Sequence, residues 1–211
     1  MAYFPLFVDL TGKTVLIAGG GPVAARKARV LLDCGPRVVV CAPQPIGELE
    51  ALEQVELLRR PFSPELLEGV SLAVAATGDR AVNHQIAVLC RARAIPVDVA
   101  DSAQESTFLF PALVRRGRLT VGISTGGASP AASAWARKAV EEALPPDLEP
   151  ILDWLAEVRE TVKGALPQPE HRAVFARLLS AALEAGRPLT PGELRAVLTD
   201  RSPCASPEDP L

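Results

Sequence analysis

The stretch Thr14-Val-Leu-Ile-Ala-Gly-Gly-Gly-Pro-Val-Ala-Ala-Arg-Lys-Ala-Arg-Val-Leu-Leu32 decides the fold of this chain. Residues 15–18 form an uninterrupted apolar run that leads into three glycines, and apolar residues then recur at helical spacing. An apolar run, a glycine turn and a helical repeat predict a buried strand, a tight turn and a helix. We therefore expect this stretch to open a parallel α/β sheet.

The three glycines predict a dinucleotide site. Gly19 allows the turn, Gly21 lets a phosphate approach the backbone, and Ala24 takes the small third position of G-x-G-x-x-G/A. Pro22 suits the first helical turn, whose N–H groups have no intrahelical partner. The helix N-terminus also offers a partial positive charge to a pyrophosphate. A purely steric turn is the alternative, and the strand-to-helix context favours the nucleotide site.

Further strands follow at regular intervals. Apolar runs predict strands over residues 37–41, 55–60, 70–77 and 95–100, and helical patterns lie between them. Strands that alternate with helices imply right-handed parallel crossovers. The predicted fold class is therefore α/β, with a Rossmann-type doubly wound parallel sheet.

Ligands of such sheets bind at the carboxyl ends of the strands. The second strand ends in Cys41-Ala42-Pro43-Gln44, without the acidic residue that often holds the adenosine ribose, so residue chemistry leaves NAD versus NADP open. The fourth strand ends at Thr77. The predicted cofactor-binding residues are Gly19, Gly20, Gly21, Pro22, Val23, Ala24, Pro43, Gln44 and Thr77.

The pattern changes beyond residue 101. Residues 106–114 and 118–124 predict the two strands of a hairpin, and Ser129 is placed to cap a helix over residues 131–144. Helical patterns continue over residues 147–165 and 169–185 and after Thr190.

Composition excludes several classes of partner. The net charge of −3 over 211 residues gives no reason to expect nucleic acid or an anionic membrane surface. The N-terminus has no basic segment before its apolar residues, and no apolar run is long enough to span a bilayer. The four cysteines form no C-x-x-C pair, so we expect reduced thiols, no resident metal and a cytoplasmic protein.

Several motifs taken together resemble the precorrin-2 dehydrogenase / sirohydrochlorin ferrochelatase family, which includes the N-terminal module of siroheme synthase and stand-alone relatives. They are Phe4-Pro5-Leu6-Phe7, the glycine turn through Ala28, Ala75-Ala76-Thr77 with Val82-Asn83, Val99-Ala100-Asp101, Phe108-Leu109-Phe110-Pro111 and Ser124-Thr125-Gly126-Gly127-Ala128-Ser129-Pro130. The resemblance implies a homodimer that oxidises precorrin-2 to sirohydrochlorin with NAD⁺, for siroheme or cobalamin synthesis. Some members also insert Fe²⁺ or Co²⁺ into sirohydrochlorin.

The resemblance also implies a division of the chain. We expect an NAD-binding Rossmann domain over residues 1–112 and a small α+β dimerisation and substrate region over 113–146. A helical domain over 147–200 would follow, and residues 201–211 would form a disordered tail.

Asp101 is the predicted catalytic base. Dehydrogenation removes a hydride and a proton, so the site needs a base beside the nicotinamide. Asp101 follows the fifth strand at the edge where the nicotinamide should project, and the resemblance identifies it as the acid/base residue. The alternative is a carboxylate that caps its own turn through the N–H of Ser102 or Ala103.

The tetrapyrrole substrate would carry eight carboxylates and so needs local positive charge and hydrogen-bond donors. The predicted substrate-binding residues are Arg115, Arg116, Arg118, Ser124, Gly126, Gly127 and Ser129. Adjacent side chains on a strand point to opposite faces, so at least one arginine should belong to a solvated hairpin tip. Ser129 should be a helix cap first and a substrate contact second.

Two other classes of function stay open. A non-catalytic dinucleotide-sensing regulator would bind NAD⁺ without oxidising precorrin-2. A structural dimerisation protein would bind no dinucleotide and would tolerate the loss of Gly21.

Overall fold

A computed structural model describes residues 3–200 of the chain, which divides into two compact units. One unit comprises Met1–Phe110 together with Gly126–Ala128, and the other comprises Pro111–Thr125 together with Ser129–Leu211. The predicted tail over residues 201–211 lies outside the described residues. Within the described part, no helix combines the length and the apolar character needed to cross a membrane.

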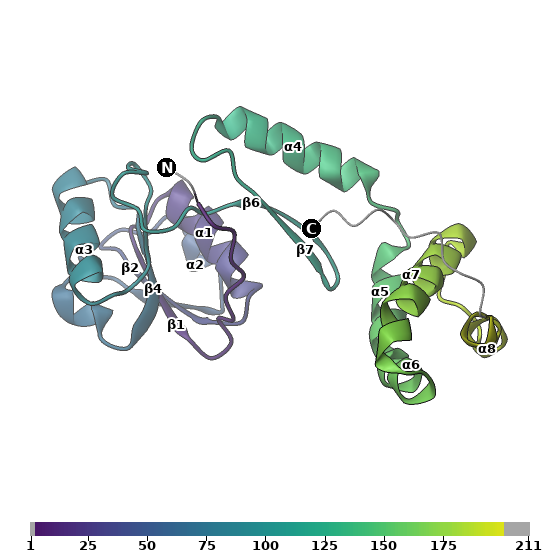
Figure 1. Cartoon of the computed structure of the whole chain (residues 1–211). Coiled ribbons are helices and arrows are strands. Elements are labelled where there is room, and N and C mark those ends of the chain that lie inside the picture. Colours follow the sequence, from purple (N-terminus) through teal and green to yellow (C-terminus); the bar gives the residue numbers. More distant parts are fainter. Residues whose placement is uncertain (1–2, 201–211) are drawn as a thin grey trace. The chain divides into compact units, whose positions relative to one another are not determined.

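The first unit is built on a parallel five-stranded sheet (Figure 1). Its strands are β1 (Thr14–Ala18), β2 (Arg37–Cys41), β3 (Val55–Leu58), β4 (Val70–Ala75) and β5 (Val97–Val99), in the order β3-β2-β1-β4-β5. The connections are α1 (Pro22–Leu32), α2 (Gly47–Glu50), the 3₁₀ helix η1 (Pro64–Leu67) and α3 (Arg80–Ala92). The order reverses beside β1, so the predicted Rossmann-type doubly wound sheet is confirmed.

Alternating side chains of the strands supply two hydrophobic layers. Val15 and Ile17 of β1 pack with the α1 side of the sheet, whereas Leu16 and Ala18 pack with the α3 side. Figure 1 shows α1 and α3 on opposite sides of the sheet. A strand covered on both faces reads as a continuous apolar run, which is why residues 15–18 carry no polar interruption.

The segment after β5 differs from the prediction. Residues 106–111 do not form a strand of the hairpin, because their hydroxyls bond the backbone of β5 instead. Thr107 Oγ1 accepts a hydrogen bond from Val97 N at 2.8 Å, and Ser106 Oγ accepts one from Val99 N at 2.9 Å. These side chains satisfy an otherwise open sheet edge and hold the segment in an irregular path.

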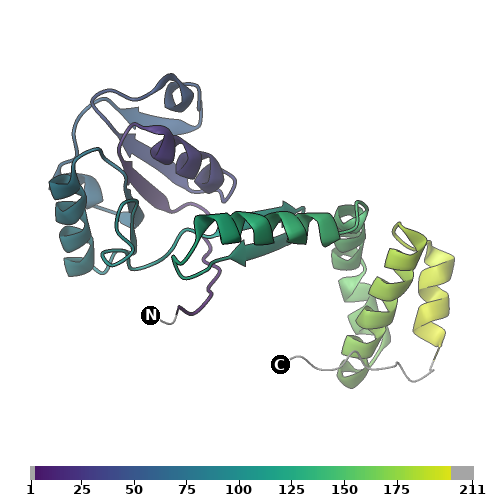
Figure 2. The ribbon, with the colours of Figure 1, turned by 90° about the horizontal axis from the view of Figure 1, so that it is seen from above.

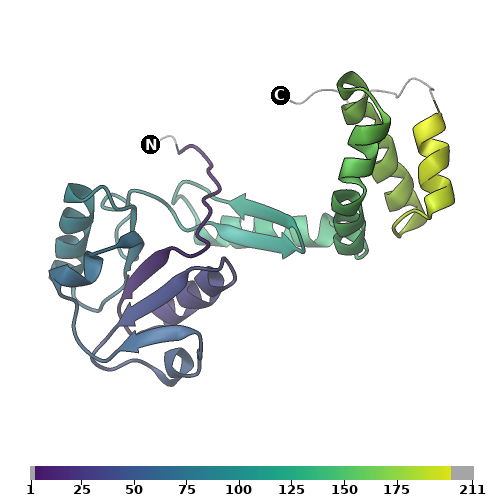
Figure 3. The ribbon, with the colours of Figure 1, turned by 90° about the horizontal axis from the view of Figure 1, so that it is seen from below.

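The second unit begins with the hairpin of β6 (Ala112–Arg116) and β7 (Leu119–Ile123). The helix α4 (Pro130–Ala143) lies along this hairpin (Figures 2 and 3). The remaining helices are α5 (Leu148–Glu157), α6 (Arg159–Ala165), α7 (Gln168–Ala185) and α8 (Pro191–Thr199). The helical pattern over residues 147–165 is thus two helices, which meet at Val158.

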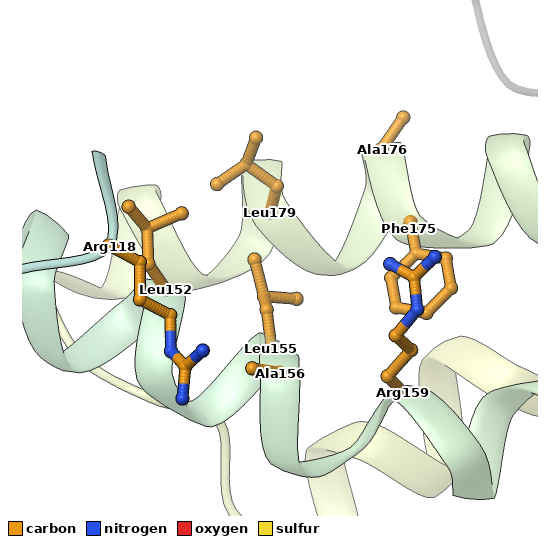
Figure 4. A pocket seen from close by; sticks show the side chains of 8 residues that line it. All are labelled: Arg118, Leu152, Leu155, Ala156, Arg159, Phe175, Ala176 and Leu179. Carbon is orange, nitrogen blue, oxygen red and sulfur yellow. The ribbon is translucent and has the colours of Figure 1, made fainter. Parts of the chain in front are cut away.

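The helices of the second unit pack around a core of their own. Its fully buried members include Ile151, Val162 and Leu178. An open groove beside this core is lined by leucines of α5 and α7, with the side chains of Arg118 and Arg159 at opposite ends (Figure 4).

A buried ion pair joins α1 to β5 in the first unit. Lys27 Nζ lies 2.6 Å from Asp98 Oδ2, and the two residues are 8% and 6% exposed. The same Nζ lies 4.3 Å from the centroid of the Phe110 ring. The ammonium is therefore held by a carboxylate and an aromatic face together, which compensates for its removal from water.

We expect Lys27→Met to destabilise the protein by about 3 kcal/mol, because it leaves the Asp98 carboxylate buried without a partner. Adding Asp98→Asn to that variant removes the unpaired charge and should recover much of the loss. Urea unfolding of the two variants measures both effects. A double variant that is less stable than Lys27→Met would show that the charge of Asp98 has another partner.

Candidate cofactor and active site

Gly19 is required by the fold itself. Its φ is +130°, and a Cβ built on it would lie 2.1 Å from the carbonyl oxygen of Ala76. Gly19 N donates to Cys41 O at 2.9 Å, and Ala76 N donates to Ala18 O at 2.7 Å. The carboxyl ends of β1, β2 and β4 are thus joined directly at this glycine.

Gly20 brings the predicted loop after β2 to the turn. A Cβ on Gly20 would lie 2.9 Å from Gln44 O, and Gly20 O accepts a hydrogen bond from Ile46 N at 2.9 Å. Pro43 and Gln44 therefore lie in a loop that is held against the glycine turn, as a contact with the ribose of a cofactor would require.

Gly21 is different, because a Cβ there would meet no protein atom within 4 Å. Its φ of −92° suits any residue, so neither packing nor backbone conformation requires glycine. Gly21 is the N-cap of α1 without a side-chain cap, and the first turn contains no acidic residue. The N–H groups of Val23 and Ala24 thus lack intrahelical partners. This open, uncapped helix start fits the pyrophosphate of a dinucleotide.

Asn83 of α3 fixes the end of β4. It is 1% exposed, and its Oδ1 accepts hydrogen bonds from Thr77 N at 3.0 Å and Thr77 Oγ1 at 2.7 Å. Its Nδ2 donates to Thr77 O at 3.2 Å. The sequence analysis includes Asn83 in a motif of the family resemblance but predicts no role for it. A polar residue on the apolar face of a predicted helix was the available signal.

Asp101 lies in a turn two residues beyond β5, and its side chain is 44% exposed. Its Oδ1 accepts hydrogen bonds from Asn83 Nδ2 and from Arg80 Nη1, both at 3.3 Å. Arg80 also pairs with Glu105 at 2.7 Å, and His84 Nδ1 lies 3.3 Å from the same carboxylate. The carboxylate of Asp101 is therefore held by α3, at the edge of the sheet that also carries Thr77.

The residues predicted to bind substrate fall in both units. Gly126 and Gly127 belong to the first unit, where a Cβ on Gly127 would lie 4.0 Å from the Cβ of Ala103. Both have positive φ, at +63° and +85°. Their position beside the turn of Asp101 agrees with the predicted role, which stays a prediction.

The other predicted substrate residues belong to the second unit. Ser129 is the N-cap of α4, as expected, since its Oγ accepts from Ala132 N at 3.2 Å. Arg118 forms an ion pair with Asp153 of α5 at 2.8 Å. Arg115 and Arg116 are exposed near the end of β6, and Ser124 directly follows β7. Their roles toward a substrate also stay predictions.

Burial suppresses the ionisation of two cysteine thiols. Burial raises the pKa of the Cys41 thiol, at the end of β2, and that of the Cys90 thiol, both to about 11. We expect iodoacetamide at pH 8 to leave both thiols unmodified in the folded protein, because the thiolate is the reactive form. Peptide mass spectrometry checks this, with urea-unfolded protein as the fully labelled control. Rapid labelling of folded Cys41 would contradict it.

Comparisons with known proteins agree with this geometry. A family described as putative NAD(P)-binding matches residues 6–112, where the parallel sheet and its glycine turn lie. The siroheme synthase of Photorhabdus laumondii is 38% identical over 178 residues, and that of Methylococcus capsulatus is 39% identical over 178 residues. These alignments cover 83% of this chain, which spans only 38% of the length of either relative.

A solved structure extends the match beyond the sheet to most of the chain. The structure described as SirC, precorrin-2 dehydrogenase, superposes with a TM-score of 0.72 at 26% sequence identity, covering 93% of this chain and 97% of that one. The prediction of NAD as cofactor is confirmed by the NAD(P)-binding domain. The glycine turn, the sheet and the helical unit therefore place this chain in the precorrin-2 dehydrogenase family.

Proposed function

We propose that this protein oxidises precorrin-2 to sirohydrochlorin with NAD⁺, as a step in siroheme or cobalamin synthesis. One observation carries the proposal. The carboxylate of Asp101 is connected through Asn83 to Thr77, at the same edge of the sheet as the open glycine turn. A base and a cofactor site thus share one edge, as hydride and proton removal require.

Each residue group has a distinct role in this proposal. Bound NAD⁺ supplies the hydride acceptor. The residues that would hold it are Gly19, Gly20, Gly21, Pro22, Val23, Ala24, Pro43, Gln44 and Thr77. Asp101 accepts the proton that the substrate loses, and its partial exposure leaves it accessible to a large tetrapyrrole.

The substrate carboxylates need donors outside the cofactor site. The residues proposed for this are Ser124, Gly126, Gly127, Ser129, Arg115, Arg116 and Arg118. The exposed guanidinium groups of the hairpin can pair with carboxylates, and the helix start at Ser129 offers N–H groups.

The direct test mixes the protein with precorrin-2 and NAD⁺ without oxygen and follows the absorbance of sirohydrochlorin. Formation of sirohydrochlorin that depends on both protein and NAD⁺ supports the proposal. Binding of NAD⁺ without turnover would instead identify a regulatory protein that senses the dinucleotide. Failure to bind any dinucleotide would favour a structural role.

Metal insertion is a second candidate activity. The partly exposed Asp101 carboxylate could also accept the pyrrole protons that Fe²⁺ or Co²⁺ displaces from sirohydrochlorin, one at a time, and release each to water before it takes the next. Preformed sirohydrochlorin mixed with Fe²⁺ or Co²⁺ and the protein tests this without NAD⁺. Insertion at the uncatalysed rate would exclude it.

We also propose that the protein is a homodimer. None of the residues of α4 is buried within the described chain, and the Trp135 side chain on this helix is 73% exposed. An exposed tryptophan on a helix that has no buried residue is typical of a protein interface. Light scattering after size-exclusion chromatography gives the mass, and the monomer mass at micromolar concentration would contradict the proposal.

A further inference from the structure

We propose that Asn83 is a positioning residue, which orients the carboxylate of Asp101 for proton removal. The inference rests on the proposed function, because it concerns the base of that reaction. Asn83 contacts neither the reacting atoms nor the helix start of α1; it acts through Asp101.

The hydrogen bonds of Asn83 fix the orientation of its amide. Thr77 N can only donate, so the atom 3.0 Å from it must be the oxygen Oδ1. The nitrogen Nδ2 must then face Thr77 O at 3.2 Å and Asp101 Oδ1 at 3.3 Å. The two hydrogens of Nδ2 have one acceptor each, so the amide has no equally good flipped orientation.

This arrangement selects one oxygen of Asp101. Among the described residues, both side-chain contacts of the carboxylate, from Asn83 and Arg80, fall on Oδ1. Oδ2 is left for the proton of a substrate. A base must hold this geometry within hydrogen-bonding reach of the proton, and Asp101 stands in a turn where the strand ladder no longer restrains it.

Asn83 restrains Asp101 better than Arg80 does, although Arg80 carries the charge. The Arg80 side chain is 53% exposed and also pairs with Glu105, so its ion pair with Asp101 is screened by water and contributes little. Asn83 is buried and held by three contacts with Thr77. The Asn83 donor is therefore held in place more firmly than the half-exposed guanidinium group of Arg80.

The test is a double-mutant cycle on the full chain with Asn83→Ala and Asp101→Asn. We expect Asn83→Ala to lower kcat by about 30-fold with a smaller change in KM, because a misplaced base slows proton transfer. In the Asp101→Asn background, Asn83→Ala should cost less than about 2-fold, since the group it orients is gone. Circular dichroism and the Kd for NAD⁺ show whether each variant remains folded.

Two further variants test whether the loss of activity comes from the orientation of Asp101, from the charge of Arg80 or from a disturbed helix α3. Arg80→Gln removes the cation and should lower kcat by less than about 3-fold. His84→Gln changes the neighbouring residue of α3, which contacts Glu105 and not Asp101, and serves as the matched control. A larger loss from Arg80→Gln than from Asn83→Ala would overturn the inference.

The pH profile tests whether the carboxylate beside Asn83 is the base that titrates in the reaction. Asn83→Asp places a second carboxylate beside Asp101, where Arg80 from α3 is the nearest cation and Glu105 from the following turn shares it. Two adjacent carboxylates resist joint ionisation, so the acidic limb of the kcat profile should move upward by about one pH unit or more. An unmoved limb in a folded variant would show that the titrating base is not the carboxylate beside residue 83, and Asn83 would then have no base to orient.

The cycle also distinguishes its own failure from failure of the proposed function. Wild-type turnover by Asp101→Asn would remove Asp101 as the base and with it the proposed mechanism. A large loss from Asp101→Asn together with an equal loss from Asn83→Ala in both backgrounds would retain the base and reject Asn83 as its positioning residue.

Discussion

Asp101→Asn is expected to lower kcat for precorrin-2 oxidation by about 100-fold or more, the usual contribution of a positioned base. The amide has the shape of the carboxylate and can still accept the hydrogen bond from Asn83, but it cannot take up the substrate proton. The Kd for NAD⁺ should stay unchanged, because the glycine turn is untouched. Steady-state kinetics and a fluorescence titration with NAD⁺ measure the two quantities.

Glu105→Gln provides the matched control for this prediction. Glu105 shares Arg80 with Asp101 and is also a carboxylate, but it pairs with His84 and lies farther along the turn. Its substitution should change kcat by only a few-fold. Equal losses from the two variants would show that the negative charge of the turn matters and that Asp101 is not the base.

Gly19→Ala should destabilise the protein strongly, whereas Gly21→Ala, only two residues away, should leave its stability almost unchanged. Gly19→Ala should cost about 4 kcal/mol or more, because its φ is +130° and the new Cβ would overlap Ala76 O. Gly21→Ala should leave the stability within about 1 kcal/mol, since its φ is ordinary and its Cβ enters open space. Urea unfolding compares the two variants.

Gly21→Ala should instead weaken the binding of NAD⁺. The Cβ of Gly21→Ala would occupy the space that the pyrophosphate needs, so we expect the Kd for NAD⁺ to rise by about 10-fold or more. Insertion of metal into preformed sirohydrochlorin, if the protein catalyses it, should survive this substitution. Unchanged NAD⁺ affinity in folded Gly21→Ala would place the pyrophosphate elsewhere.

The features that the sequence predicted are those encoded in contiguous residues. The strand, turn and helix around Gly19 follow from apolar runs and glycine chemistry, and Ser129 caps its helix because the cap is a local contact. The doubly wound parallel sheet follows from the regular alternation of strand and helix, which permits few topologies.

The features that the sequence did not predict depend on long-range contacts. Lys27 and Asp98 are 71 residues apart, and no local pattern shows that two charges on apolar elements form a buried pair. Asn83 acquires its role only when α3 brings it beside both Thr77 and Asp101. The side-chain pattern of residues 106–111 predicts a strand. In the structure the hydroxyls of Ser106 and Thr107 instead accept hydrogen bonds from the backbone N–H groups of β5.

In the proposed reaction, this sheet edge holds NAD⁺ while precorrin-2 is oxidised. A single-turnover reaction with limiting precorrin-2, in which NADH and sirohydrochlorin are measured together, tests it most directly. We expect one NADH for each sirohydrochlorin formed, at a rate that falls at least about 100-fold in Asp101→Asn. Tight binding of NAD⁺ without any NADH, or sirohydrochlorin formed at the same rate without NAD⁺, would contradict it.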